Sequence, residues 1–146
     1  MMIERVEEQI IRAADIEDTD AILTFDLIAQ DDTKRQMLIR KAVEQGHCTV
    51  AKVSGQAVAY IIMERNFFGW PFIELVYVHS DYRQQGLAAT LMRYIESRCE
   101  EKLFTSTNLS NLQMQRLLEK LGYTISGVVH NLDEGDPEIV YFKRRN

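Results

Sequence analysis

The sequence has few of the residues that build disulfide-linked or metal-binding proteins. It contains two cysteines in 146 residues, Cys48 and Cys99, and they do not form the closely spaced pairs that hold zinc or carry out redox chemistry. Its three histidines are dispersed along the chain. We therefore expect free, buried thiols in a reducing compartment, and so a cytoplasmic protein that uses no metal.

Long apolar runs and an excess of positive charge are also missing. No apolar stretch approaches the roughly 20 residues that a membrane helix needs, and the acidic N-terminus lacks the order of a signal peptide. The 17 Lys and Arg residues are outnumbered by 22 Asp and Glu residues, which gives a net charge of -5. Because binding to nucleic acid requires clustered cations, we expect neither a nucleic acid nor a membrane as a partner.

What is present is the composition of an ordinary globular domain. The chain is 46% hydrophobic and 27% charged, and its length suffices for one domain over residues 1–146 with a full core. Segments of strand-like and helix-like periodicity alternate in the order βααβββαβαββ. This order predicts an α/β or α+β fold, a mixed sheet with helices on both sides.

Capping and turn residues set the boundaries of several of these segments. Side chains in Asp15–Asp18 can cap the first helix, and Asp31 or Asp32 the second. Gly46 is placed to end the second helix, on which we expect Met37 to face the core. Ser54 and Gly55, between the next two strands, are typical of a hairpin turn.

The stretch DYRQQGLAATLM at 81–92 lies between a strand-like segment and an amphipathic helix expected to reach about Glu100, with Glu96 outside its apolar stripe. A helix start leaves backbone N–H groups without partners and concentrates positive charge there. Gly86 lets a ligand approach the backbone, and Arg83 adds a charge. The stretch therefore predicts a phosphate or pyrophosphate site, with tight packing of Gly86 against the sheet as the alternative. The GxxxxGKS/T and GxGxxG patterns are absent.

The second informative stretch is NLQMQRLLEKLGY at 111–123, in which a polar start is followed by apolar residues at helical spacing. Ser110 and Gln113 have the spacing of a capping box, which predicts a helix that starts at about Asn111. Gly122 is placed to end this helix in the left-handed conformation, so that Tyr123 can pack back on it.

Together, these two stretches resemble the Gcn5-related N-acetyltransferase (GNAT) superfamily. RQQGLA at 83–88 looks like the family's R/Q-x-x-G-x-G/A pyrophosphate loop, and 111–123 is similar to its NxxAxxLYxKxGF signature. The second match rests on Asn111, Leu117, Lys120 and Gly122, with Tyr123 in place of Phe. The predicted order of elements is also the family's, so the resemblance covers nearly the whole chain. It implies the GNAT fold, with a central, mostly antiparallel sheet and helices on both faces.

The resemblance implies that the chain binds acetyl-CoA. Backbone amides of the loop would hold the pyrophosphate, the strand before it would pair with the pantetheine arm, and Asn111 would contact the pantetheine end. The residues implied in cofactor binding are Val76, Tyr77, Val78, Arg83, Gln84, Gln85, Gly86, Leu87, Ala88 and Asn111.

The resemblance also implies acetyl transfer to a primary amine by direct attack, without a covalent enzyme intermediate. An amine with a pKa of about 10.4 must lose a proton before it attacks. Glu74, which strand alternation places on the same face as Val76 and Val78, stands where the family often has an acidic residue that accepts this proton. The alternative for Glu74 is a strand-end carboxylate that faces solvent.

One position departs from the family's pattern. The tyrosine that the family uses to protonate the departing thiolate is replaced by Leu118, and Tyr94, Tyr141 or Ser110 could substitute. The second candidate function is therefore a CoA-binding module that has lost catalysis.

Two further stretches bear on the acceptor and leave it open. The acidic loop NLDEGDPE at 131–138 is either a solvated turn or, if it reaches the acceptor, a reason to favour a cationic one. The aromatic stretch at 67–72, with Phe67, Phe68, Trp70 and Phe72, could line a pocket, form a small second core or cover the partner in a homodimer.

Overall fold

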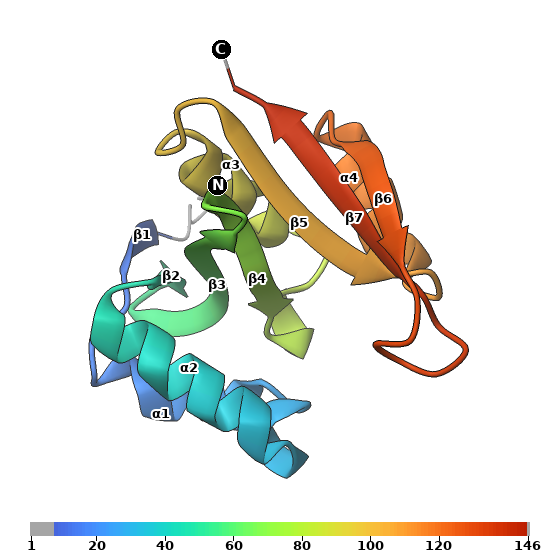
Figure 1. Cartoon of the computed structure of the whole chain (residues 1–146). Helices are drawn as coiled ribbons and strands as arrows, with labels where there is room; N and C mark the ends of the chain where they lie inside the picture. The colour runs from blue at the N-terminus through green and yellow to red at the C-terminus, as the bar shows by residue number, and fades with distance from the viewer. Residues whose placement is uncertain (1–7, 146) are drawn as a thin grey trace, which may run out of the picture. The chain divides into compact units, whose positions relative to one another are not determined.

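The structure is a computed structural model that describes residues 8–145 (Figure 1). Its helices and strands follow the predicted order βααβββαβαββ, with two short 3-10 helices in addition. In chain order the elements are β1 (Gln9–Ala13), α1 (Asp18–Phe25), η1 (Ala29–Asp31), α2 (Thr33–Gln45), β2 (Cys48–Val53), β3 (Gln56–Phe67), β4 (Trp70–Val78), η2 (Ser80–Tyr82), α3 (Leu87–Glu96), β5 (Lys102–Asn108), α4 (Leu112–Lys120), β6 (Thr124–Val129) and β7 (Glu138–Arg144).

The seven strands are hydrogen-bonded in the order β1-β2-β3-β4-β5-β7-β6. The pairs β1–β2, β2–β3, β5–β7 and β6–β7 are antiparallel, whereas β4 and β5 run parallel. The α/β fold with a mixed, mostly antiparallel sheet is thereby confirmed. The turn at Ser54 and Gly55 joins β2 and β3 as predicted, and both residues have positive φ values, 50° and 84°.

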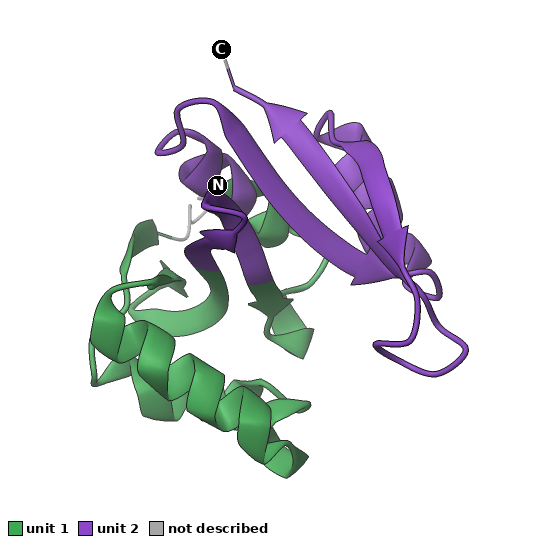
Figure 2. Cartoon of the chain, in the orientation of Figure 1, with its two compact units in different colours: residues 1–62, 75–91 green, residues 63–74, 92–146 purple. Residues whose placement is uncertain are grey.

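The chain divides into two compact units (Figure 2). Unit 1 contains the chain up to Ile62 together with Leu75–Leu91, and unit 2 contains Met63–Glu74 and the chain from Met92 onward. Three elements, β3, β4 and α3, contribute residues to both units. The expectation of a single domain over residues 1–146 stays a prediction.

In unit 1, α1 and α2 bury apolar side chains in a core that also contains residues of β2, β3 and β4. Asp32 caps α2 by accepting a hydrogen bond from the backbone N–H of Arg35 at 3.0 Å, and Gly46 ends the helix at a φ of 77°. Both caps were predicted. The inward placement of Met37 was wrong, because its side chain is 65% exposed.

The start of α1 differs from the prediction. Its N-cap is Glu17, whose side chain makes no capping hydrogen bond. Asp18 instead lies in the first turn and accepts hydrogen bonds from the Asp15 N–H at 2.9 Å and from Nη1 of Arg12 at 2.7 Å. Burial alone would raise the pKa of Asp18, but these two hydrogen bonds hold it below its usual value.

A buried carboxylate fixes the connection between α1 and α2. Oδ1 of Asp26 accepts hydrogen bonds from the N–H groups of Ile28 and Ala29, both at 3.0 Å. Its Oδ2 accepts from Nε of Arg35 at 2.9 Å and from the hydroxyl of Tyr60. Because Asp26 is completely buried, these four hydrogen bonds offset the desolvation cost of placing a carboxylate there.

In unit 2, α4 begins one residue later than the capping box predicted. Asn111 is the N-cap and accepts from the Met114 N–H at 3.1 Å, whereas Ser110 bonds elsewhere. The helix ends as expected, with Gly122 at a φ of 92° and the N–H of Tyr123 bonded to the carbonyl of Leu118 at 2.9 Å.

The end of α3 also differs from the prediction, because the helix stops at Glu96 rather than near Glu100. Glu96 is only 4% exposed. Its carboxylate accepts from the hydroxyl of Tyr123 at 3.0 Å and from Nζ of Lys143 at 2.7 Å. Sequence periodicity placed Glu96 outside the buried stripe, but partners from distant parts of the chain bury it.

Candidate functional site

In unit 1, β4 is followed by an exposed turn that leads into α3. Gln84 and Gly86 both have φ in the left-handed region, 62° and 79°, so the chain reverses sharply there. Residues 83–86 are exposed, whereas Leu87, the first residue of the helix, is fully buried. The buried leucine anchors the helix start and leaves the backbone of the turn open to solvent.

The structure argues against the packing explanation for Gly86. A Cβ added at this position would meet no atom within 4 Å, so the glycine is not needed for tight packing against the sheet. It is needed for its positive φ. The space over its backbone is therefore open to a ligand.

The first turn of α3 presents backbone donors on this side. The first intrahelical bond there runs from the Thr90 N–H to the carbonyl of Gly86 at 2.9 Å. The N–H groups of residues 87–89 precede it, and helix geometry gives them no carbonyl one turn earlier. Ala88, with its small side chain, is only half-buried. Such a helix start can bind an anion through its main chain.

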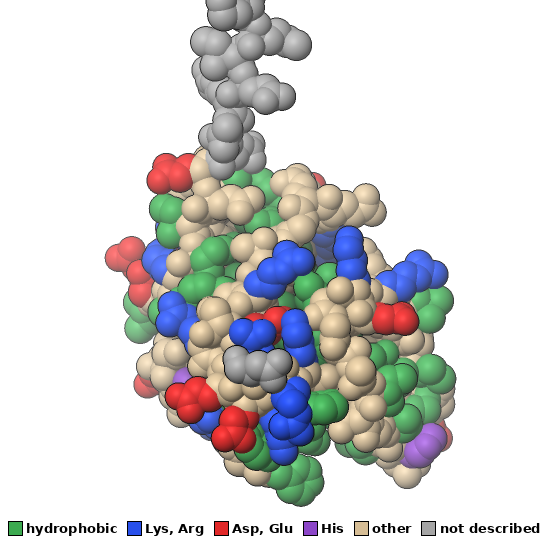
Figure 3. All heavy atoms as spheres, turned by 90° about the horizontal axis from the view of Figure 1, so that it is seen from above, with side chains coloured by type: hydrophobic (Ala, Val, Ile, Leu, Met, Phe, Trp, Pro, Cys, Tyr) green, Lys and Arg blue, Asp and Glu red, His purple; other side chains and the backbone are tan. Residues whose placement is uncertain are grey.

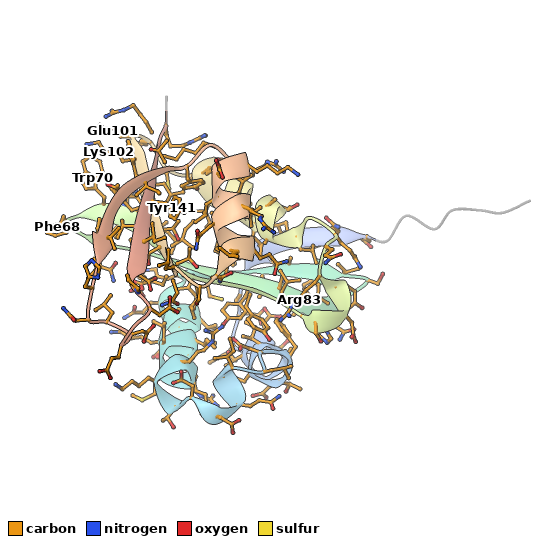
Figure 4. The ribbon with its side chains drawn as sticks, turned by 90° about the vertical axis from the view of Figure 1, so that its right-hand side faces the viewer. Phe68, Trp70, Arg83, Glu101, Lys102 and Tyr141 are labelled. Carbon is orange, nitrogen blue, oxygen red and sulfur yellow. The ribbon has the colours of Figure 1, made fainter. Side chains whose placement is uncertain are left out.

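Arg83 lies beside β4 at the start of this turn (Figure 4). Its Nε donates to the carbonyl of Val78 at 3.1 Å, and its guanidinium carbon is 5.3 Å from the ring centroid of Tyr77. The Tyr77 hydroxyl accepts from the N–H of Leu27 at 3.2 Å, so this side chain belongs to the core of unit 1. A contact between Tyr77 and a cofactor would thus involve its backbone, which is the contact that the resemblance implies.

Glu74 belongs to unit 2 and is half-buried. Its Oε1 accepts a hydrogen bond from Nδ2 of Asn66 at 2.8 Å, and the same nitrogen lies 3.2 Å from Oε2 of Glu64. A carboxylate that is held in place yet reachable can serve as a general base. Asn66 was not predicted, because no spacing pattern in the sequence links it to Glu74.

The position of the family's tyrosine is occupied by a completely buried Leu118. Of the possible replacements, Tyr141 is buried, and desolvation followed by the charge of Glu119 raises its pKa. The Ser110 hydroxyl donates to Asp136 at 2.6 Å. Tyr94 is half-buried, and its oxygen accepts from Arg98. Tyr94 is therefore the most available proton donor of the three.

The acidic loop between β6 and β7 bonds to its own unit. Asp136 accepts from both the N–H and the hydroxyl of Ser110, and Asp133 accepts from Asn108 at 2.8 Å. Glu138, at the start of β7, accepts from the Ser106 hydroxyl at 2.8 Å. Three of the four carboxylates thus hold the loop in place, which weakens the expectation that they select a cationic acceptor.

The cysteines and the other ionisable groups give no sign of covalent or metal chemistry in the part that the structure describes. Both cysteines are buried free thiols, as predicted. Burial, followed by the nearby charge of Asp18, raises the pKa of Cys48 to about 12, and burial raises that of Cys99. Within residues 8–145, no three His, Cys, Asp or Glu side chains cluster as metal ligands would. None of the helices in that range is long and apolar enough to cross a membrane.

Several known proteins are similar to this chain. A sequence model of the acetyltransferase (GNAT) family matches residues 12–123. A GNAT-family acetyltransferase from Bacillus cereus ATCC 10987 is 32% identical, with a TM-score of 0.87 over 95% of this chain and 99% of that one. Ard1 from Thermoplasma volcanium is 18% identical, with a TM-score of 0.83 over 94% and 98% of the two chains.

A third similar structure was solved with a ligand. The Salmonella typhimurium protein yncA, in complex with its cofactor acetyl-CoA, is 21% identical, with a TM-score of 0.73 over 94% of each chain. No curated protein sequence matches the chain.

Proposed function

Because this chain belongs to the GNAT family of acetyltransferases, we propose that it transfers the acetyl group of acetyl-CoA to a primary amine by direct attack. Family membership carries the general activity, acetyl transfer. The amine acceptor, the order of bond changes and the role of each residue are the proposal.

The main structural support for the proposal is the exposed turn after β4. Gly86 has a positive φ and open space above it, and the unpaired N–H groups at the start of α3 follow directly. This arrangement suits the pyrophosphate of acetyl-CoA, because main-chain donors and the helix dipole both favour a doubly charged anion. The side chains of Gln84 and Gln85 need no special role, since they are exposed and the donors are in the backbone.

The remaining cofactor contacts follow the resemblance. Backbone groups of Val76, Tyr77 and Val78, in the extended part of β4, would pair with the amides of the pantetheine arm. Oδ1 of Asn111 already accepts from the Met114 N–H. Its amide N–H groups are the donors it could offer to the pantetheine end.

In the reaction, Glu74 accepts a proton from the ammonium group of the acceptor. The neutral amine then attacks the thioester carbonyl and a C–N bond forms. The C–S bond breaks, the sulfur leaves with the bonding electrons, and the second proton of the attacking nitrogen passes to the thiolate or to water. A thiol with a parent pKa of about 8.5 is a fair leaving group near neutral pH. The raised pKa values of Cys48 and Cys99 disfavour an acetyl-cysteine intermediate, because the thiolate is the nucleophile.

A thermal-shift measurement tests the cofactor assignment. At 100 times its Kd, acetyl-CoA should stabilise the folded protein by about 2.7 kcal/mol and raise the Tm by several degrees. Pantetheine without phosphates, at the same concentration, should shift the Tm far less, because it lacks the group that the turn binds. Equal shifts with the two compounds would rule out the turn at 83–88 as a pyrophosphate site.

The second candidate, a CoA-binding module without catalysis, is favoured by the buried Leu118 alone. We expect Leu118→Tyr to lower the Tm, since a larger side chain at a fully buried site costs about 1–3 kcal/mol. Leu118→Phe is the matched control, because it adds similar volume without a hydroxyl. Turnover should be measurable in the wild type and similar in the two folded variants. A wild type without turnover that Leu118→Tyr alone activates would favour the second candidate.

A further inference from the structure

A row of aromatic rings crosses three strands of unit 2 on one face of the sheet. Phe72 of β4 is the register partner of Phe104 of β5, which is the register partner of Phe142 of β7. The ring centroids of Phe104 and Phe142 are 5.8 Å apart. Phe67, at the end of β3, completes the row at 5.1 Å from Phe72 and 4.9 Å from Phe104. We call these four rings, with Trp70, the aromatic face.

The buried side chains of these strands alternate with the aromatic face. The residues that alternate with it, such as Ile73, Leu103 and Tyr141, are buried, whereas the rings of the aromatic face are only half-buried. In Figure 4, Tyr141 lies on the side of β7 toward α4, and Phe68, Trp70 and Lys102 lie on the other side. Phe68, at the turn beside the face, is 90% exposed. A contiguous, partly exposed aromatic surface of this kind can serve as a binding site.

One end of the aromatic face is positively charged. Nζ of Lys102 lies 4.6 Å from the ring centroid of Trp70, and Lys102 is the register partner of Arg144. Like charges directly opposite each other weaken a strand pair. The ion pairs among residues 8–145 use other cations. The view from above, onto the end where β5 starts and β7 finishes, shows several Lys and Arg side chains there, with Asp and Glu side chains among them (Figure 3). These two cations are therefore available to an anionic group.

The opposite end of the face carries the proposed base. Glu74 lies two residues after Phe72 in β4, so strand alternation directs both side chains to the same face. Trp70 lies four residues before Glu74, which corresponds to about 13 Å along a strand. The face thus runs from a carboxylate that can accept a proton, over the aromatic rings, to a pair of cations.

From this arrangement we infer that the acetyl acceptor is an extended peptide with apolar side chains next to its reactive amine and an acidic residue about four positions away. The amine meets Glu74, the apolar side chains lie on the aromatic face, and the acidic side chain pairs with Lys102 and Arg144. The inference rests on the proposed function, since it places the acceptor at Glu74.

The length of the face and the charges at its two ends favour an extended peptide as the acceptor. An amine and a carboxylate about 13 Å apart correspond to four residues of extended chain, a separation that a small monoamine lacks. Cations at one end and a carboxylate at the other match a peptide whose ammonium group and acidic side chain are arranged in the reverse order. The rings between them favour apolar side chains over charged ones.

Synthetic pentapeptides with a free amino terminus and an amidated carboxyl terminus test the inference. The first has apolar residues at positions two to four and glutamate at the fifth, the second has lysine at the fifth, and the third has serine at positions two to four. The glutamate peptide should give a kcat/KM about 5- to 10-fold higher than either of the others. The difference should appear in KM, because these contacts are the same in the ground and transition states.

Charge reversal provides the matched test. Lys102→Glu should remove or invert the preference for the glutamate peptide over the lysine peptide. Arg116→Glu changes an exposed residue of α4 in the same unit, and this variant should keep the preference of the wild type. Phe104→Leu should raise KM for the glutamate peptide and leave KM for the serine peptide near its wild-type value. The Tm of each variant shows whether it is folded.

The outcomes separate the inference from the proposed function. Equal kcat/KM for all three peptides, or a small monoamine that matches the best peptide, would overturn the inference while acetyl transfer stands. Absence of both turnover and stabilisation by acetyl-CoA would overturn the proposed function and the inference with it. If light scattering shows a dimer that Lys102→Glu dissociates, with the peptide preference unchanged, a second copy of the chain occupies the face and the inference is wrong.

Discussion

Glu74→Gln is expected to lower turnover by roughly 10²- to 10⁴-fold near neutral pH while leaving the affinity for acetyl-CoA unchanged. The amide is nearly isosteric and keeps the oxygen that accepts from Asn66, so the local geometry should survive. It cannot take a proton from the ammonium group of the acceptor. Initial rates and isothermal titration with acetyl-CoA measure the two quantities separately.

The rate of Glu74→Gln relative to the wild type should depend on pH. An acceptor amine, with a pKa of about 10.4 for a lysine-type side chain or about 7.7–8.0 for a peptide amino terminus, becomes more neutral as the pH rises. Raising the pH should therefore recover part of the rate of Glu74→Gln, because less of the substrate then needs a base. Glu64→Gln is the control, since Glu64 contacts the same Asn66 amide but is not the proposed base. A wild-type-like rate in Glu74→Gln across the pH range would remove Glu74 from the mechanism.

Gly86→Val is the second substitution with a large expected effect, and it should weaken acetyl-CoA binding by at least about tenfold. The added side chain enters the open space above the turn, where the pyrophosphate is proposed to bind. A β-branched residue is also strained at a φ of 79°. Arg83→Ala should have a smaller effect, because Arg83 is exposed and its Nε already bonds to the carbonyl of Val78.

Gly55→Val separates the loss of binding from the cost in stability. Gly55 has a similar φ of 84°, and a Cβ there would also meet nothing within 4 Å, but it lies in the β2–β3 hairpin. Both variants should lose stability, and only Gly86→Val should lose affinity for acetyl-CoA. An unchanged Kd in folded Gly86→Val protein would mean that the phosphates bind elsewhere.

Local signals in the sequence predicted most of the fold. The order of elements followed from periodicity, and Asp32, Gly46 and Gly122 lie at the helix ends where capping rules placed them. The errors concern residues whose surroundings come from distant segments. Glu96 fits a solvent-facing position within its own helix, but Tyr123 and Lys143, far along the chain, bury it.

In the candidate site, too, features encoded by neighbouring residues could be predicted, and contacts between distant segments could not. The proposed site at 83–88 could be predicted because anion binding there would depend on consecutive backbone groups, which a short motif encodes. The partner of Glu74 could not, since Asn66 comes from the neighbouring strand β3. The aromatic stretch at 67–72 was visible in the sequence, but Phe104 and Phe142, which extend it into a surface, come from β5 and β7.

The most direct test of acetyl transfer to an amine is a mass-balance measurement on the purified protein. The protein is incubated with acetyl-CoA and the glutamate pentapeptide or a panel of primary amines. Free thiol is measured by a colorimetric reagent and the acetylated amine by mass spectrometry. The account predicts equal amounts of CoA and N-acetylated product, formed with multiple turnovers. Binding of acetyl-CoA without any acetylated amine, or release of CoA matched only by free acetate, would contradict it.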